Sequence, residues 1–195
     1  MTEQIRSKKR VADFGEVYTN EREVNAMVDL VKEEAEKITS TFLEPACGNG
    51  NFLMEILRRK LTSVARIYGY DMTEYRLHMI EAVASIYGVD IQPDNVQESR
   101  KRLLYLCCEE YAESYADNLS DGTITALKCV MERNIICGNT LTCLADDGSP
   151  LVFSEWRLKE NGMFERKDFL FADILEDRNE SITDEPIIYD WRVVA

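Results

Sequence analysis

Apolar residues recur at three- and four-residue steps near the start of the chain, and this spacing predicts an amphipathic helix over residues 23–38. Such a spacing places the apolar side chains along one stripe of a helix. The stripe consists of Val24, Met27, Val28, Val31, Ala35 and Ile38. Thr19 and Asn20 lie just before it, and either side chain is suited to cap the first turn.

The pattern then changes from a helical to an extended one. Residues 41–43 predict a short buried strand, residues 44–51 form a turn that contains two glycines, and a second apolar stripe predicts a helix over residues 52–67. A strand, a glycine-containing turn and a helix in this order form the opening half of a βαβ unit.

Helices and strands continue to alternate up to residue 141. We predict helices over residues 74–84, 93–111 and 123–132, and strands over residues 85–91 and 134–138. This alternation is typical of a parallel α/β sheet.

The last third of the chain has a different character. Two strand-like runs, at residues 151–156 and 163–171, flank an Asn-Gly pair that predicts a β-hairpin. Residues 173–190 hold many acidic side chains and one basic one, so we expect a solvated segment there before a last strand-like stretch at 186–194.

Composition limits the chemistry of the protein. Of the 195 residues, 36 are acidic and 23 are Lys or Arg, so the net charge is −13, which argues against a broad nucleic-acid-binding surface. The first residues form a basic arm with Arg6, Lys8, Lys9 and Arg10. No apolar run approaches the about 20 residues that cross a bilayer, so we expect a cytoplasmic protein without membrane contact. One histidine and six cysteines without a C-x-x-C pair argue against a zinc site and against a Ser-His-Asp hydrolase.

The glycine turn allows a ligand to approach the backbone, and the helix after it points its N-terminal amides toward that ligand. The turn reads EPACGNGN, which lacks the lysine of a P-loop and does not match the G-x-G-x-x-G of dinucleotide-binding sites.

The longer stretch FLEPACGNGNFL resembles motif I of class I S-adenosylmethionine (SAM)-dependent methyltransferases, in the variant found in adenine-N6 DNA methyltransferases of restriction–modification systems. Three further stretches agree in order. FGEVYTN at 14–20 looks like motif X, IYGVDI at 86–91 is similar to the acidic end of strand 2, and ICGNTL at 136–141 resembles the strand 3 motif, with G-N where that motif usually reads G-D.

The resemblance spans residues 10–145 and implies a fold class, α/β with a Rossmann-like methyltransferase sheet that is incomplete and has a C-terminal β-hairpin. It divides the chain into a basic arm with motif X (1–22), a SAM-binding domain (23–145) and a hairpin with an acidic C-terminal segment (146–195).

The resemblance also implies a set of cofactor-binding residues. Thr19 would contact the methionine part of SAM, Asp90 would accept hydrogen bonds from the ribose hydroxyls, Ile91 would pack against the adenine, and Asn139 would accept a bond from the adenine amino group. The complete set is Tyr18, Thr19, Glu44, Pro45, Ala46, Gly48, Gly50, Phe52, Asp90, Ile91 and Asn139.

Two aspartates compete for the ribose contact. Asp71 follows Gly50 at close to the spacing of about 20 residues that is usual for such an acidic residue. Asp90 lies at the end of a better strand and is followed by Pro93, which begins a helix. We prefer Asp90 and interpret the stretch around Asp71 as part of a helical insertion.

The catalytic motif of the family, D/N/S-P-P-Y/F/W, is absent because none of the four prolines has a matching neighbour. The nearest stretch, Ser154-Glu155-Trp156, lacks the prolines. Three hypotheses remain open: a SAM-binding subunit that reaches DNA and catalysis through a protein partner or a homo-oligomer, an inactive pseudo-methyltransferase that serves as a regulatory module, and a compact methyltransferase for a non-DNA substrate.

Overall fold

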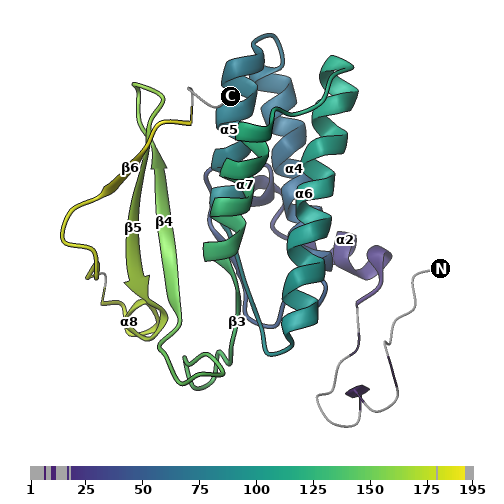
Figure 1. The fold of residues 1–195 in the computed structure, drawn as a ribbon. Coiled ribbons are helices and arrows are strands. Elements are labelled where there is room, and N and C mark those ends of the chain that lie inside the picture. The colour runs from purple at the N-terminus through teal and green to yellow at the C-terminus, as the bar shows by residue number, and fades with distance from the viewer. Residues whose placement is uncertain (1–6, 8–9, 12–16, 18, 179, 192–195) are drawn as a thin grey trace.

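The computed structural model describes residues 7, 10, 11, 17, 19–178 and 180–191 (Figure 1). This part of the chain folds into the helices α2 (Glu21–Asp29), α3 (Lys32–Ala35), α4 (Asn51–Tyr68), α5 (Met72–Ala84), α6 (Pro93–Tyr115), α7 (Asp121–Asn134) and α8 (Phe171–Leu175). Its strands are β1 (Phe42–Glu44), β2 (Ile86–Asp90), β3 (Ile135–Cys137), β4 (Val152–Leu158), β5 (Phe164–Leu170) and β6 (Ile187–Tyr189). None of its helices combines the length and the apolarity that a bilayer crossing requires.

The strands form two separate sheets. β1, β2 and β3 make a parallel sheet in the order β1-β2-β3, with Leu43 opposite Tyr87 and Val89 opposite Ile136. β4, β5 and β6 make an antiparallel sheet in which β4 and β5 pair along their whole length. The predicted α/β class and the predicted C-terminal hairpin are therefore confirmed.

Each connection between parallel strands contains two helices. α4 and α5 lie between β1 and β2 in the sequence, and α6 and α7 lie between β2 and β3. In Figure 1 these four helices run side by side, with α5 and α7 on the side of the hairpin, and both contact β4. The helices supply most of the main core.

A second, smaller core joins the hairpin to the parallel sheet. Val89 of β2 packs with Leu151, Phe153 and Phe171, all of which are nearly inaccessible to solvent. The Tyr87 hydroxyl donates a hydrogen bond to the carbonyl of Ser154 over 3.0 Å. Odd-numbered residues of β2 thus face the hairpin, as the alternation of side chains along a strand requires.

The predicted helix over residues 23–38 is wrong in its length, because the chain breaks between α2 and α3. Asn20 caps α2 by accepting a hydrogen bond from the Glu23 N–H. The apolar stripe is only partly covered: Ala35 is fully buried, whereas Met27 is 54% and Val31 46% exposed. The break redirects the chain so that Ala35 reaches the core, which the spacing of apolar residues alone does not reveal.

The acidic C-terminal segment is anchored to the hairpin rather than only solvated. The Asp168 N–H donates to the Thr183 hydroxyl over 3.0 Å, and the Ile182 N–H donates to the Asp168 carbonyl over 2.8 Å. Beyond it, β6 pairs with β5, and Trp191 is buried against Phe164.

A buried lysine fixes the chain where it enters β1. Lys60 of α4 is completely buried, and its Nζ donates to the carbonyls of Lys37, Ile38 and Ser40 over 2.8, 3.0 and 2.6 Å. Three carbonyl acceptors match the three donors of an ammonium group. This cluster ties α4 to the segment that leads into β1.

Candidate functional site

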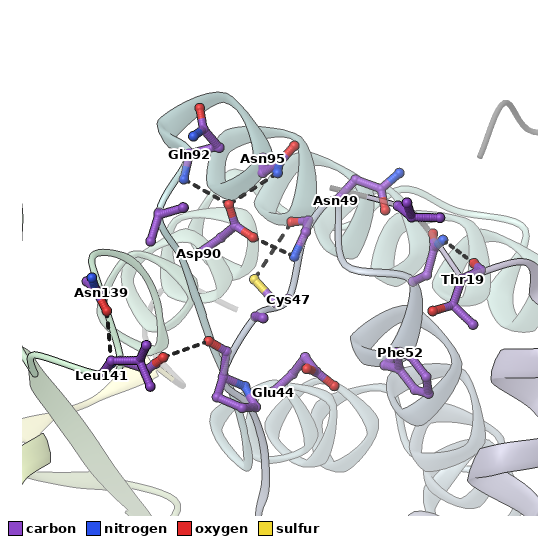
Figure 2. Close-up of a pocket in the computed structure, with 17 residues that line it drawn as sticks. Thr19, Glu44, Cys47, Asn49, Phe52, Asp90, Gln92, Asn95, Asn139 and Leu141 are labelled. Atoms are coloured by element: carbon purple, nitrogen blue, oxygen red, sulfur yellow. Dashed lines mark hydrogen bonds between the residues drawn. The ribbon is translucent and has the colours of Figure 1, made fainter. Parts of the chain in front are cut away.

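A pocket of about 450 Å³ opens at the carboxyl ends of β1, β2 and β3 (Figure 2). This volume lies in the range of small-molecule sites, and the carboxyl end of a parallel sheet is where α/β proteins bind ligands. The lining residues are Val17, Thr19, Glu44, Pro45, Ala46, Cys47, Gly48, Asn49, Asn51, Phe52, Asp90, Ile91, Gln92, Asn95, Asn139, Thr140 and Leu141.

The glycine turn between β1 and α4 forms the floor of this pocket. Gly48 and Gly50 have φ angles of 52° and 86°, a conformation that favours residues without a Cβ. The Cys47 N–H donates to the Val89 carbonyl over 2.8 Å, which holds the turn against the end of β2. α4 begins at Asn51, so the positive end of its dipole lies at the pocket wall.

Asp90 connects three segments of the pocket wall. Its Oδ2 accepts a hydrogen bond from the Gly48 N–H over 2.9 Å, and its Oδ1 accepts bonds from the Gln92 N–H over 2.8 Å and from the Asn95 Nδ2 over 3.1 Å. A carboxylate has about four acceptor positions, so one position of Asp90 remains for a ligand hydroxyl. A diol would have to share that position or displace one of the protein donors.

Asp71 has a different role. Its side chain caps α5 by accepting hydrogen bonds from the N–H groups of Thr73 and Glu74 over 2.8 and 3.1 Å. It is exposed and does not line the pocket. Of the two aspartates that the sequence left in competition, only Asp90 lies where a pocket ligand would contact it.

The pocket is acidic. Burial raises the pKa of the Glu44 carboxyl, and the N–H of Ala46, which donates to this carboxyl, opposes that rise. Asp90 provides a second carboxyl, and the described lining residues include no lysine or arginine. This combination favours a ligand with positive charge and hydroxyl donors over a phosphorylated one.

Most of the other residues that the resemblance implied also line the pocket. Thr19, Pro45, Ala46, Phe52 and Ile91 line the pocket together with Glu44, Gly48 and Asp90. Gly50 does not line it; it precedes α4 and packs against Ser99 of α6, so its part is to shape the turn. Tyr18 lies outside the described residues.

Asn139 lines the pocket, but its amide is oriented by the chain itself. Its Oδ1 accepts a hydrogen bond from the Leu141 N–H over 2.9 Å. The oxygen that we expected to serve the adenine amino group therefore already accepts one bond, and one of its two lone pairs remains for a ligand. The Leu141 side chain beside it is 94% exposed.

The sequence interpretation missed several lining residues. Cys47, Asn49 and Asn51 lie inside the glycine turn, so the motif itself was the signal that could have included them. Gln92 and Asn95 follow Asp90 at the beginning of α6, where the first turn of a helix faces the strand end. The Asn49 Oδ1 is buried and has no hydrogen-bond partner among the described residues.

Arg102 of α6 supports the pocket from outside. Its Nη1 donates to the Asn49 carbonyl over 2.7 Å and to the Asn51 Oδ1 over 2.8 Å. The Asn51 Nδ2 in turn donates to the Thr19 carbonyl over 2.9 Å. Arg102 thus links the glycine turn to the N-terminal segment that lines the pocket.

The basic arm contributes one described contact beside the pocket. Arg10 forms a two-bond ion pair with Asp94, in which its Nη1 and Nη2 lie 2.6 and 3.1 Å from the carboxylate oxygens. Because the Arg10 side chain is only 18% exposed, it is not part of a freely solvated tail.

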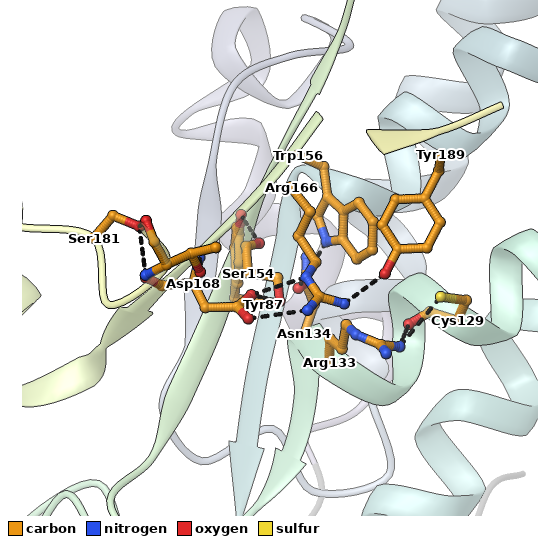
Figure 3. A network of polar contacts seen from close by, with 11 residues as sticks. Tyr87, Cys129, Arg133, Asn134, Ser154, Trp156, Arg166, Asp168, Ser181 and Tyr189 are labelled. Atoms are coloured by element: carbon orange, nitrogen blue, oxygen red, sulfur yellow. Dashed lines mark hydrogen bonds and ion pairs between the residues drawn. The ribbon is translucent and has the colours of Figure 1, made fainter. Parts of the chain in front are cut away.

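The Ser154-Glu155-Trp156 stretch lies in β4, away from the pocket. The Ser154 hydroxyl donates to the Asp168 Oδ1 over 2.6 Å, and the Trp156 Nε1 donates to the Asn134 Oδ1 over 3.2 Å (Figure 3). Arg166, which pairs with Asp168, lies over the Trp156 ring. The Trp156 hydrogen bond holds the hairpin to α7, whereas the other contacts lie within the hairpin. None of them involves a residue that lines the pocket.

Neither a metal site nor a comparison with known proteins narrows the function of the pocket. Within the described ranges there is no group of three or more His, Cys, Asp or Glu side chains that could hold a metal ion. All six cysteines are free thiols, and burial raises the pKa of Cys47 in the pocket. Comparisons of the chain with protein-family models, with curated proteins and with solved structures give no match.

Proposed function

We propose that this chain binds SAM in the pocket at the ends of β1, β2 and β3. In this proposal it is a Rossmann-like methyltransferase-fold protein of the adenine-N6 DNA methyltransferase kind, and a partner chain completes its catalytic site. The single observation that carries the proposal is the acidic pocket itself, in which Glu44 and Asp90 lie together without a lining lysine or arginine among the described residues.

The strand order supports the fold part of the proposal. A Rossmann sheet has the order 3-2-1-4-5-6, and β3-β2-β1 reproduces its first half. The glycine turn follows the first strand and Asp90 ends the second, as in sheets of this kind that hold a nucleoside. The second helix in each connection departs from the simplest form of that fold.

The charge of the ligand separates SAM from other nucleosides. SAM carries a sulfonium and an ammonium, whereas NAD and ATP bring phosphates that would approach two carboxyl groups. The pocket also offers the apolar surfaces of Phe52 and Ile91 to a ring. These features fit a cationic nucleoside.

The chain's own residues would orient such a ligand. Asp90 would accept a ribose hydroxyl at its remaining acceptor position, Glu44 would face the positively charged part, and the N-terminal amides of α4 would face the carboxylate. When bound, SAM supplies an activated methyl group. The described residues around the pocket include no polar–Pro–Pro–aromatic stretch to present an amine to it.

The absence of a polar–Pro–Pro–aromatic stretch is the reason why the proposal includes a partner chain. The Ser154 hydroxyl is engaged with Asp168 inside the hairpin and the Trp156 indole with Asn134 of α7, so neither is free to hold a flipped base. The same observation favours a second candidate, a SAM-binding regulatory module without turnover. The two candidates differ in whether any partner from the same operon restores methyl transfer to DNA.

Calorimetric titration tests the proposal. The purified chain should bind SAM, and Asp90→Ala should weaken the affinity at least about tenfold, the loss of one charge-assisted contact. Asp71→Ala is the matched control, because it removes an aspartate that caps α5 outside the pocket. NAD and ATP should not compete. No SAM binding by the folded wild-type chain, or equal loss in both variants, would contradict the proposal.

A further inference from the structure

The first strand of the parallel sheet has a free edge. β1 pairs with β2, and no other described strand pairs with it. The Phe42 N–H donates to the Ser85 carbonyl over 3.0 Å, so the polar groups of Phe42 face β2. Because these groups alternate along a strand, the N–H and C=O of Leu43 face away from β2. Leu43 is 41% exposed at this edge.

An apolar groove of about 480 Å³ lies beside that edge. Its walls come from β1, β2, the hairpin and α8, and they comprise Thr41, Leu43, Tyr87, Phe153, Glu155, Phe169, Phe171 and Ile174. The aromatic side chains brace one another: the rings of Tyr87 and Phe153, and those of Phe153 and Phe171, meet edge to face with centroids 5.3 Å apart. The groove is therefore walled by packed aromatic rings and open to solvent.

The strand that follows in the chain does not take the position beside β1. In the order 3-2-1-4 that position belongs to the next strand after β3. Here β4 pairs with β5 from Val152 to Leu158 and turns its inner face to Tyr87 rather than joining the sheet. Among the described residues, no strand pairs with the outer edge of β1 beside the groove, so both can accept another polypeptide.

The charges around the groove define the kind of polypeptide. Glu155 lies in the groove wall, where its carboxylate is 3.6 Å from the Arg157 Nη2. The acidic segment 173–190 begins within α8, the helix that contributes Phe171 and Ile174. The whole chain carries a net charge of −13, so a second copy would be repelled. An open strand edge selects an extended backbone, and the aromatic walls select apolar side chains at alternate positions.

We propose that the free edge of β1 and the adjoining groove bind an extended β-strand of a partner protein, apolar at alternate positions and flanked by lysine or arginine. A strand added parallel to β1 leaves the sheet at the end where Glu44 and Pro45 line the pocket. The residues that follow it then reach the pocket mouth. The interaction itself does not depend on SAM binding, so failure of one proposal leaves the other standing.

The test uses three synthetic peptides on the full chain. The first, KKTVTVTVKK, carries the stated features, and the second has glutamate flanks. The third is the first peptide with its central threonines and valines N-methylated, so that no central N–H can donate to β1. We expect the first to bind with a Kd below about 1 mM and to shift the Leu43 amide signal in NMR spectra. The other two should bind at least about tenfold more weakly.

Reversing the charge of Glu155 tests whether this residue sets the charge preference of the groove. Glu155→Lys should weaken the lysine-flanked peptide and strengthen the glutamate-flanked one, whereas Glu160→Lys in the exposed hairpin turn should change neither. Both positions are exposed, so neither variant endangers folding. No saturable binding of the first peptide up to about 1 mM, equal binding of the N-methylated peptide, or self-association of the chain abolished by Leu43→Lys would overturn the proposal.

Discussion

The Asp90 carboxylate accepts a hydrogen bond from the backbone N–H of Gly48 over 2.9 Å, across a separation of 42 residues. This contact joins the end of β2 to the glycine turn that follows β1. Both segments line the pocket, so the bond sets their spacing. The shape of the pocket therefore depends on a charged acceptor at position 90.

We expect Asp90→Asn to lower the free energy of unfolding by about 1–3 kcal/mol, because an amide NH₂ must then face the N–H of either Gly48 or Gln92. Urea-induced unfolding followed by circular dichroism measures the change. Asp71→Asn is the control, since asparagine caps a helix as well as aspartate does. An Asp90→Asn protein as stable as that control would show that the carboxylate does not hold the turn.

The sequence predicted those parts of the site that depend on local patterns. A short apolar run, a glycine turn and a helical stripe identified β1 and α4, and an acidic residue at a strand end identified Asp90. Spacing alone could not separate Asp90 from Asp71, because only the structure reveals that Asp71 caps α5. The local signal for that role is an aspartate just before a predicted helix, which is a typical N-cap pattern.

Contacts between distant segments could not be predicted in this way. Arg102 and Asn49 are 53 residues apart, and nothing in the pattern around Arg102 distinguishes it from an exposed helical arginine. The break between α2 and α3 likewise depends on which apolar residues find a partner, as the exposure of Met27 and the burial of Ala35 demonstrate.

Arg102→Met should weaken SAM binding about tenfold, because the Asn49 carbonyl and the Asn51 side chain lose the donor that holds them. Calorimetry provides the affinity and urea unfolding the stability. Arg100→Met is the matched control: Arg100 also lies on α6, but it donates to the carbonyls of Ile135 and Glu132, away from the pocket. If both variants lose affinity in proportion to stability, Arg102 has no specific role in the pocket.

Lys60 should make the stability of the protein depend on pH. Burial lowers its pKa from 10.5 to about 7, although Glu81, Glu34 and the three carbonyls that accept from its Nζ favour the charged form. Between about pH 7 and 10 the unfolded chain therefore binds more protons than the folded one, and this group's contribution to the free energy of unfolding rises with pH.

The rise is at most about 1.4 kcal/mol per pH unit, and it should be absent in Lys60→Met. The comparison with this variant is needed because burial also raises the pKa of Cys107, whose contribution falls above its unfolded pKa. Urea unfolding of both proteins at pH 7, 8 and 9 supplies the measurement. A constant difference between them over that range would show that Lys60 keeps an ordinary pKa.

Gly50→Ala should lower the free energy of unfolding more than Gly148→Ala, because Gly50 combines a positive φ angle with a close contact and Gly148 has the positive φ angle only. A Cβ at Gly50 would lie 2.4 Å from the Ser99 Oγ and 3.3 Å from the Ser99 Cα, and the φ angle there is +86°. Gly148 has a similar φ of +81° but open space within 4 Å, so Gly148→Ala measures the backbone strain by itself, about 1–2 kcal/mol. Gly50→Ala should cost about 1–3 kcal/mol more, because α6 must shift away from the turn.

A second substitution separates the clash from the strain at Gly50. The Ser99 Oγ is buried and has no hydrogen-bond partner among the described residues, so Ser99→Ala alone should be nearly neutral. Combined with Gly50→Ala it removes the closest contact and should recover part of the lost unfolding free energy, which a double-mutant cycle detects as coupling. Purely additive costs would mean that contact with α6 at Ser99 does not constrain the glycine turn at Gly50.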